Sequence, residues 1–150
     1  MRRAAQLLPR LNVAEKDYSH RDVVDKLGVK PGHAVALVGP ADPALRQRVL
    51  EKTGRAPATA DEPADVVLVW ADAATDPVKT LRDWKTKIDP SGGIWLLTPK
   101  RTQPGYVDQN DLIEAGKLAG VVDNKTCSVS DTTSAIRFVI RKADRPRPVY

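Results

Sequence analysis

The chain has 150 residues, of which 41% are hydrophobic and 29% are charged, values typical of one soluble globular domain. Its one cysteine, Cys127, excludes an internal disulfide and favours a reducing compartment. No segment approaches the roughly 20 consecutive apolar residues of a membrane span, and the first ten residues lack the apolar stretch of a signal peptide. We therefore expect a cytoplasmic protein that does not associate with a membrane.

The net charge of +5 is concentrated at the two ends of the chain. Residues 1–10 and 141–150 each carry a net charge of +3, whereas residues 11–140 carry −1. Charged termini of this kind are often disordered and solvated. We expect a flexible leader over 1–18, a single domain over 19–142 and a basic disordered tail over 143–150.

The chain alternates between short apolar runs and helical patterns before it ends in two consecutive strands. Strands are expected where apolar residues run continuously or alternate, and helices where apolar residues recur every three or four positions after a capping residue. In chain order these patterns predict a helix over 20–27 capped by Ser19, a strand over 33–38, a helix over 43–53 between Asp42 and Gly54, a strand over 66–70, a helix over 77–88, a strand over 94–97, a helix over 108–119, and strands over 121–129 and 135–141.

The apolar spacing also predicts which side chains of the later helices face the core. Ile88 is expected to end the inner face of the helix over 77–88, and Leu118 is expected on the inner face of the helix over 108–119. The segment Asp89–Gly93, rich in proline and glycine, is expected to be a turn between helix and strand.

This order of elements predicts an α/β, Rossmann-like three-layer domain. It would contain about five strands, three of them parallel and the last two forming a C-terminal antiparallel hairpin. The order resembles a shortened class I methyltransferase over about 33–142. The resemblance rests on the valine-rich strand over 66–70, the turn over 89–93, the strand over 94–97, and the corner at Ala119-Gly120 before the final hairpin.

The chain departs from that family where the family binds its methyl donor. The first strand is followed by Gly39 and Pro40 rather than by a glycine-rich loop, and proline has no N–H to offer a ligand. Only 11 residues separate Gly54 from Val66, too few for the strands that include the family's acidic, ribose-binding residue. We therefore expect no methyl transfer and no cofactor.

Several segments resemble one particular family more closely. They are Tyr18-Ser-His-Arg-Asp22, the segments 30–39 and 92–100, and the hairpin segments 122–129 and 134–138. On these the chain is similar, over about 18–142, to the mainly actinobacterial family called domain of unknown function 3052. This resemblance implies a bacterial cytosolic protein and carries no established activity.

Polar and basic side chains follow the carboxyl ends of the predicted parallel strands. Ligands of α/β proteins bind outside these ends, and a basic pair there would suit a small anionic ligand carrying phosphate or carboxylate. We expect Trp70 and Trp95 to flank this crevice. Solvated loop charges are the alternative. The candidate ligand-binding residues are Gly39, Asp42, Asp72, Thr98, Lys100 and Arg101.

A second polar group lies in the first strand of the hairpin. Alternation places Asp123, Lys125 and Cys127 on one face of the strand, where the lysine would lower the pKa of the thiol and make it reactive. The alternative is that Cys127 is a small buried side chain. The two histidines, His20 and His33, are too far apart in sequence to indicate a metal site, so we expect none.

Three functions remain open. We favour a non-catalytic binding or regulatory protein that has lost methyl-donor binding, with a protein partner or a second copy pairing along an exposed sheet edge at 33–38. The first alternative is a small-molecule or nucleotide-handling enzyme that uses the crevice. The second, least favoured, is nucleic-acid binding through the basic ends.

Overall fold

The computed structural model describes residues 23–145. Predictions that fall on residues 1–22 and 146–150, among them Ser19 and His20, lie outside the described residues. Within 23–145 no helix is long and apolar enough to cross a membrane.

The described chain contains one five-stranded sheet with the order β2-β3-β4-β6-β5. Strands β2, β3 and β4 are parallel neighbours, and β6 runs antiparallel between β4 and β5. This arrangement confirms the α/β, Rossmann-like class with three parallel strands and a closing hairpin. The strands are β2 (Val35–Val38), β3 (Ala64–Trp70), β4 (Ile88–Pro99), β5 (Val122–Ser128) and β6 (Thr133–Val139).

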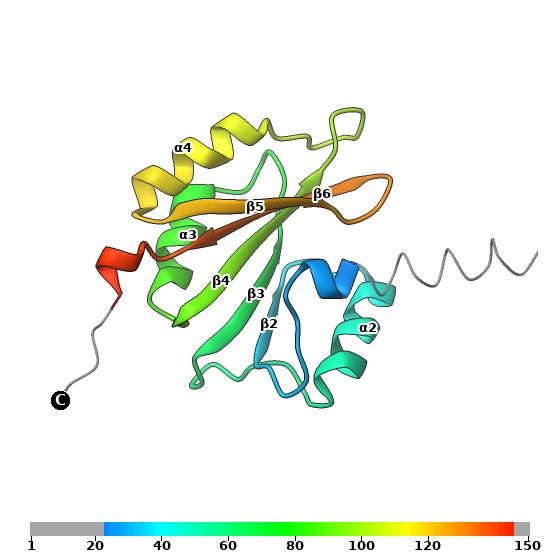
Figure 1. Ribbon diagram of the computed structural model, residues 1–150. Coiled ribbons are helices and arrows are strands. Elements are labelled where there is room, and N and C mark those ends of the chain that lie inside the picture. Colours follow the sequence, from blue (N-terminus) through cyan, green and yellow to red (C-terminus); the bar gives the residue numbers. More distant parts are fainter. Residues whose placement is uncertain (1–22, 146–150) are drawn as a thin grey trace, which may run out of the picture.

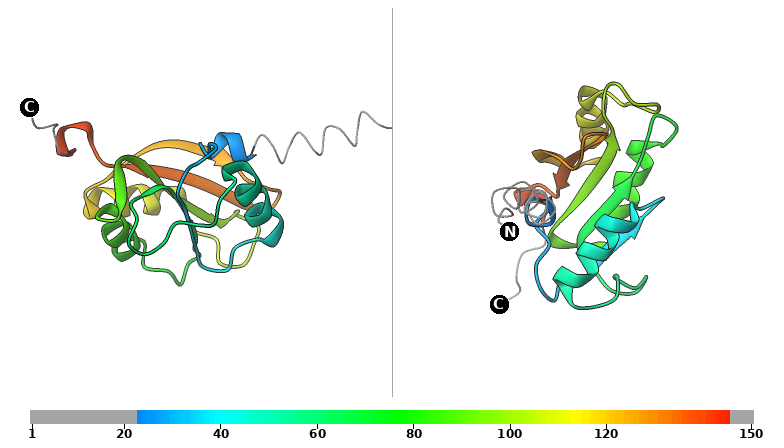
Figure 2. Two further views of the ribbon diagram at one scale, coloured as in Figure 1. Left: turned by 90° about the horizontal axis from the view of Figure 1, so that it is seen from below. Right: turned by 90° about the vertical axis from the view of Figure 1, so that its right-hand side faces the viewer.

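Three helices connect the strands, and an aspartate begins each of them. The carboxylates of Asp42, Asp76 and Asp108 accept hydrogen bonds from backbone N–H groups of the first helical turn, which stabilises a helix start. Helices α3 and α4 pack side by side, and α2 lies apart from them (Figures 1 and 2). The helices are α2 (Pro43–Thr53), α3 (Pro77–Lys85) and α4 (Gln109–Ala119), and a short 3₁₀ helix, Lys142–Asp144, follows the sheet.

The two faces of the sheet bury separate clusters of apolar side chains. On one face, Leu45 and Val49 of α2 and the helical turn at 23–26 pack over β2, β3 and β4. On the other face, Leu81 of α3 and Leu112 of α4 pack over the centre of the sheet. The chain therefore leaves β2 toward one face and β3 toward the opposite face.

Strand β4 begins earlier than the sequence pattern indicates. The helix ends at Lys85, and Ile88 already pairs with Ala64 of β3, so the predictions of a helix to Ile88 and of a turn over 89–93 are wrong. The register of β3 and β4 shifts between Ala64 and Val66. Proline and glycine are tolerated in a strand at such an irregularity.

The inner face of α4 also differs from the prediction. Leu118 is 69% exposed, and the helix is buried along Leu112, Ala115, Gly116 and Ala119 instead. A Cβ built on Gly116 would lie 2.5 Å from Cε1 of Phe138. Because the small side chains let α4 approach Phe138 this closely, small residues rather than the larger leucine mark the buried face.

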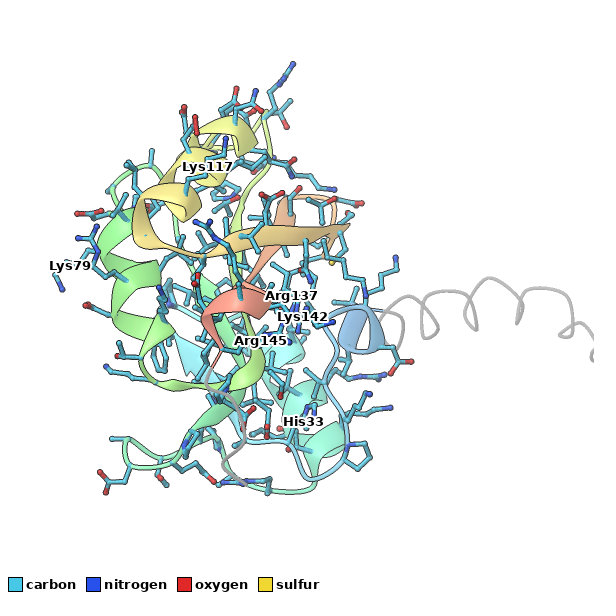
Figure 3. The ribbon with its side chains drawn as sticks, turned by 60° about the vertical axis from the view of Figure 1, so that its left-hand side comes forward. His33, Lys79, Lys117, Arg137, Lys142 and Arg145 are labelled. Carbon is cyan, nitrogen blue, oxygen red and sulfur yellow. The ribbon has the colours of Figure 1, made fainter. Side chains whose placement is uncertain are left out.

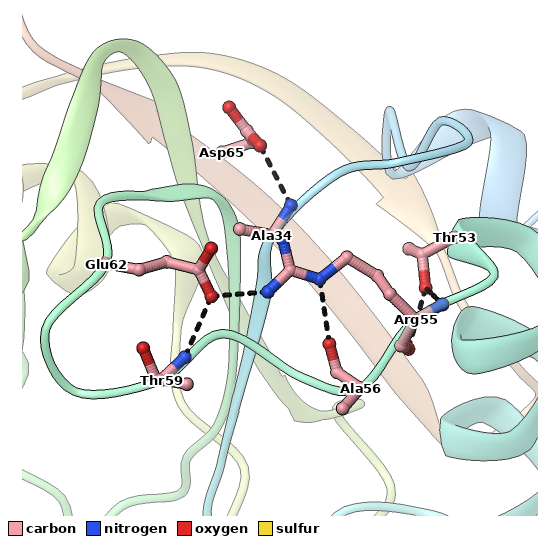
Figure 4. A network of polar contacts seen from close by, with 7 residues as sticks. All are labelled: Ala34, Thr53, Arg55, Ala56, Thr59, Glu62 and Asp65. Carbon is pink, nitrogen blue, oxygen red and sulfur yellow. Dashed lines mark hydrogen bonds and ion pairs between the residues drawn. The ribbon is translucent and has the colours of Figure 1, made fainter.

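The loop over residues 54–63 lies beside β2, on the side where a further strand would extend the sheet. It leaves α2 at Gly54, is held by a salt bridge between Arg55 and Glu62 (Figure 4), and donates the Ala58 N–H to the carbonyl oxygen of Val35 at 2.8 Å. Strand β2 is the edge of the described sheet, but this loop covers part of the edge. Pairing of a protein partner with the edge stays a prediction.

Candidate functional site

A cavity of the described residues lies at the carboxyl ends of β3 and β4. The loop after β2 turns toward the α2 face and the loop after β3 turns toward the α3 face, so a crevice opens between them, as expected where connections diverge in an α/β sheet. The cavity encloses about 440 Å³, and its lining is Pro40, Trp70, Ala71, Asp72, Thr75, Leu97, Thr98, Pro99, Gln103, Pro104, Thr132 and Thr133. We call it the crevice.

Thr98 is the most buried polar side chain of the crevice. It is 4% exposed, and its hydroxyl has no side-chain hydrogen-bond partner among residues 23–145. A buried hydroxyl without a partner costs about 1–3 kcal/mol. A ligand group that bonded this hydroxyl would remove that cost, so Thr98 is the side chain of the crevice best placed to recognise a polar group.

Asp72 and Trp70 form another wall of the crevice. The Asp72 carboxylate accepts from the Ala74 N–H at 2.9 Å and from the Thr75 hydroxyl at 3.4 Å, both through Oδ1, which leaves Oδ2 without a described partner. Trp70 is partly exposed. The crevice therefore presents an aromatic surface beside a fixed carboxylate.

Not every residue predicted for the crevice lines it. Asp42 lines an adjoining cavity of about 290 Å³ that shares Pro40, Trp70, Thr132 and Thr133 with the crevice, and its carboxylate caps α2. Gly39 lies against Trp70, because a Cβ there would be 2.8 Å from the Trp70 carbonyl oxygen. Because Gly39 has no side chain, the loop after β2 can approach the end of β3 closely.

The predicted basic pair does not line the crevice. The Lys100 Nζ donates to the Ser128 hydroxyl at 2.7 Å, and Arg101 is exposed in the following turn. Since Asp72 is the one charged side chain that the described part of the chain contributes to the lining, the crevice favours a neutral or cationic ligand over the anion suggested by the sequence. Binding by any of these residues stays a prediction.

Trp95 does not flank the crevice as expected. It is fully buried, and its indole N–H donates to the Leu27 carbonyl oxygen at 2.9 Å. It therefore ties β4 to the end of the helical turn at 23–26. The sequence pattern does not indicate the other polar residues of the lining: Thr75, Gln103 and Thr132 come from loops, and Thr133 is the first residue of β6.

The polar group of β5 is divided by a β-bulge. Asp123 pairs with Phe138, whereas Lys125 pairs with Arg137 and the register shifts between them. Because an extra residue reverses the alternation, the prediction that Asp123 shares a face with Lys125 and Cys127 is wrong. Lys125 and Cys127 do share one.

Burial raises the pKa of the Cys127 thiol, and the nearby charges of Lys26 and Lys125 act in the opposite direction. The thiol is partly buried. The direction of this pKa shift is opposite to the lowered thiol pKa that an activated nucleophile needs. Residues 23–145 also contain no group of three or more His, Cys, Asp or Glu side chains that could hold a metal ion.

Comparison with solved structures shows which class of fold this sheet order defines. The chain is similar to a SAM dependent methyltransferase from Aquifex aeolicus, with a TM-score of 0.64 and 12% identity over 81% of this chain and 89% of that one. It is also similar to the CcbJ methyltransferase from Streptomyces caelestis, with a TM-score of 0.57 and 7% identity over 81% and 89%. The fold is thus that of a class I methyltransferase.

The family is shown by sequence. The chain belongs to the family described as "Protein of unknown function (DUF3052)", whose model matches residues 24–142. Uncharacterized proteins of Mycobacterium tuberculosis and Mycobacterium bovis are each 38% identical to it over 84 residues, which are 55% of this chain. The chain covers about half, 52%, of the length of these curated relatives.

Proposed function

We propose that the protein is a non-catalytic cytoplasmic binding protein that holds a small neutral or cationic molecule in the crevice. The observation that carries the proposal is the buried hydroxyl of Thr98 at the carboxyl ends of the parallel strands, which has no side-chain hydrogen-bond partner within residues 23–145. Beside it lie the aromatic surface of Trp70 and the free Oδ2 of Asp72. A ring that carries a hydroxyl or an amine would use all three groups.

The sheet order supports a function without methyl transfer. The loop 54–63 enters β3 directly, with no strand beyond β2 among the described residues. The strand that supplies the acidic, ribose-binding residue in methyltransferases therefore has no counterpart there. Gly39 lies against Trp70, and Pro40 follows without an N–H, so the loop offers little backbone to a methyl donor.

The proposal is tested by ligand-observed NMR with two kinds of probe. The first is S-adenosylmethionine at millimolar concentration. The second is a fragment set of neutral and cationic ring compounds, with adenosine and tryptamine among them. We expect no saturation by the methyl donor and a subset of fragments that bind the wild-type protein.

Two variants locate the fragments. Thr98→Val replaces the buried hydroxyl by a methyl group of the same size, and Asp72→Asn removes the charge of the crevice. Both should weaken fragment binding, whereas Thr126→Val, at an exposed position of β5, should not. Tight binding of S-adenosylmethionine would refute the non-catalytic role, and fragments indifferent to Thr98→Val and Asp72→Asn would refute the crevice as their site.

A further inference from the structure

A second cavity lies at the opposite end of the sheet, where β3 and β4 begin. It encloses about 430 Å³. It is built from the end of the helical turn at 23–26, the turn before β2, the starts of β3 and β4, and the hairpin strands. We call it the basic cavity, and its lining is Asp25, Lys26, Leu27, Gly28, Lys30, His33, Asp65, Val66, Ser91, Gly92, Trp95, Lys125 and Arg137.

The charges of the basic cavity do not cancel one another. Its cationic side chains are those of Lys26, Lys30, Lys125 and Arg137, and none of them forms a salt bridge with another described residue. Each of its two carboxylates has a partner other than these four cations. Asp25 forms a salt bridge with Lys52 at 3.1 Å, and Asp65 accepts the Ala34 N–H at 2.8 Å (Figure 4).

Arg137 is the least exposed cation of this cavity. Its guanidinium lies against Gly93, where a Cβ would be 2.8 Å from Cζ. Its side-chain hydrogen bond among the described residues is a long one, 3.5 Å, to Oδ1 of Asn124. Burial, and then the charge of Arg145, lower the pKa of this group, yet an arginine stays protonated in proteins. A partly dehydrated guanidinium without a carboxylate is a site for an external anion.

His33 adds a hydrogen-bond donor to the same cavity. Its Nδ1 accepts the Lys30 N–H at 3.2 Å, so the proton of the neutral ring is on Nε2. The charge of Arg145 lies close enough to Arg137 to affect it (Figure 3), whereas the Lys79 and Lys117 side chains are 72% and 68% exposed on α3 and α4.

We propose that the basic cavity binds the phosphate or diphosphate group of a small molecule, at a site separate from the crevice. A planar guanidinium pairs with two phosphate oxygens at once, and the surrounding lysines match the multiple charge of a phosphate ester better than the single charge of a carboxylate. The cavity has the size of a small-ligand site.

Isothermal titration calorimetry with pyrophosphate, in a phosphate-free buffer of low ionic strength, tests the proposal. Arg137→Met keeps the apolar stem and removes the guanidinium, and Lys125→Met removes an exposed charge from the same cavity without touching the core. Each should weaken pyrophosphate binding by about tenfold or more. Lys117→Met removes the same charge from α4 (Figure 3), at a residue that does not belong to the lining of the cavity, and should leave the affinity unchanged.

Two further arms separate a built site from a general effect of charge. Inorganic phosphate should bind more weakly than pyrophosphate and compete with it. If Lys117→Met weakened binding as much as Lys125→Met does, the effect would be diffuse electrostatics and the site would be refuted. Binding of a single-stranded oligonucleotide that depends on Arg137, with no binding of pyrophosphate, would also overturn the proposal and assign the surface to nucleic acid.

Discussion

The guanidinium of Arg137 in β6 packs against the backbone of Gly93 in β4. The guanidinium of Arg137 lies where the first side-chain atom of any other residue at position 93 would be, since a Cβ there would stand 2.8 Å from Cζ. The partners lie on adjacent antiparallel strands. The glycine therefore determines where the arginine points, and with it the position of the main cation of the basic cavity.

Gly93→Ala should reduce pyrophosphate affinity because the new methyl group displaces the guanidinium of Arg137. The end of an arginine side chain can move, so the protein should still fold. The affinity loss, measured by calorimetry, should approach that of Arg137→Met.

A double-mutant cycle provides the control for this prediction. In an Arg137→Met background there is no guanidinium to displace, so adding Gly93→Ala should cause little further loss. Equal losses in both backgrounds would show that Gly93 and Arg137 act independently.

Gly116→Ala should destabilise the protein although alanine is the better helix former. The propensity gain is about 1 kcal/mol, but a Cβ would stand 2.5 Å from Cε1 of Phe138, whose ring is fully buried. Overpacking costs about 1–3 kcal/mol. Urea denaturation should therefore show a net loss, with the neighbouring exposed Lys117→Ala close to neutral. A variant more stable than wild type would contradict the close packing of α4 on the sheet.

Glu62 should make the stability of the edge loop depend on pH. Its hydrogen bond to Arg55 and the one from the Thr59 N–H hold the pKa of the Glu62 carboxyl below its ordinary value. The ionised Glu62 carboxylate therefore stabilises the folded protein at a pH above the ordinary pKa of a glutamate, and this stabilisation is lost as the pH falls through the lowered pKa. Glu62→Gln should lower the melting temperature at pH 7, and the loss should be smaller at pH 3.

Asp61→Asn is the matched control for Glu62→Gln. The Asp61 carboxylate is exposed on the same loop and forms no salt bridge with the described residues, so its loss should change the melting temperature little at either pH. A melting-temperature difference for Glu62→Gln that persisted unchanged at pH 3 would show that its effect is not that of a charge.

The sequence predicted well those features that depend on neighbouring residues. The capping aspartates and the following prolines determine where α2 and α3 begin, and left-handed Gly54 and Gly120 end α2 and α4. These are short-range backbone effects that a sequence displays directly. The short connection between α2 and β3 could also be predicted, because only 11 residues separate Gly54 from Val66.

The remaining features depend on contacts between distant segments. No residue near Asp123 indicates the bulge that separates Asp123 from Lys125. Pro90 and Gly92 are typical of a turn, and they are part of β4 because the register of β3 and β4 shifts there. The basic cavity was missed because its lining comes from segments far apart in the chain. Two features of the sequence point to it: Arg137 is a charged residue within an apolar strand, and β4 contains the glycine pair Gly92-Gly93.

Cys127 should react slowly with alkylating reagents at neutral pH. Burial raises the pKa of its thiol, so less of the reactive thiolate is present than in a free cysteine. With iodoacetamide at pH 7.5, followed by mass spectrometry, the folded protein should be modified more slowly than N-acetylcysteine. The rate should rise with pH and reach half its maximum at a higher pH than for the free thiol.

The Lys125→Met variant tests how the charge of Lys125 affects the reactivity of Cys127. The lysine charge lowers the pKa of the Cys127 thiol, against the larger effect of burial, so its removal should slow alkylation further at a given pH. Lys117→Met should have no effect, and unfolding in urea should restore the rate of a free thiol. Fast alkylation of the folded protein at pH 7.5, slowed by Lys125→Met alone, would instead identify Cys127 as an activated thiol beside the basic cavity.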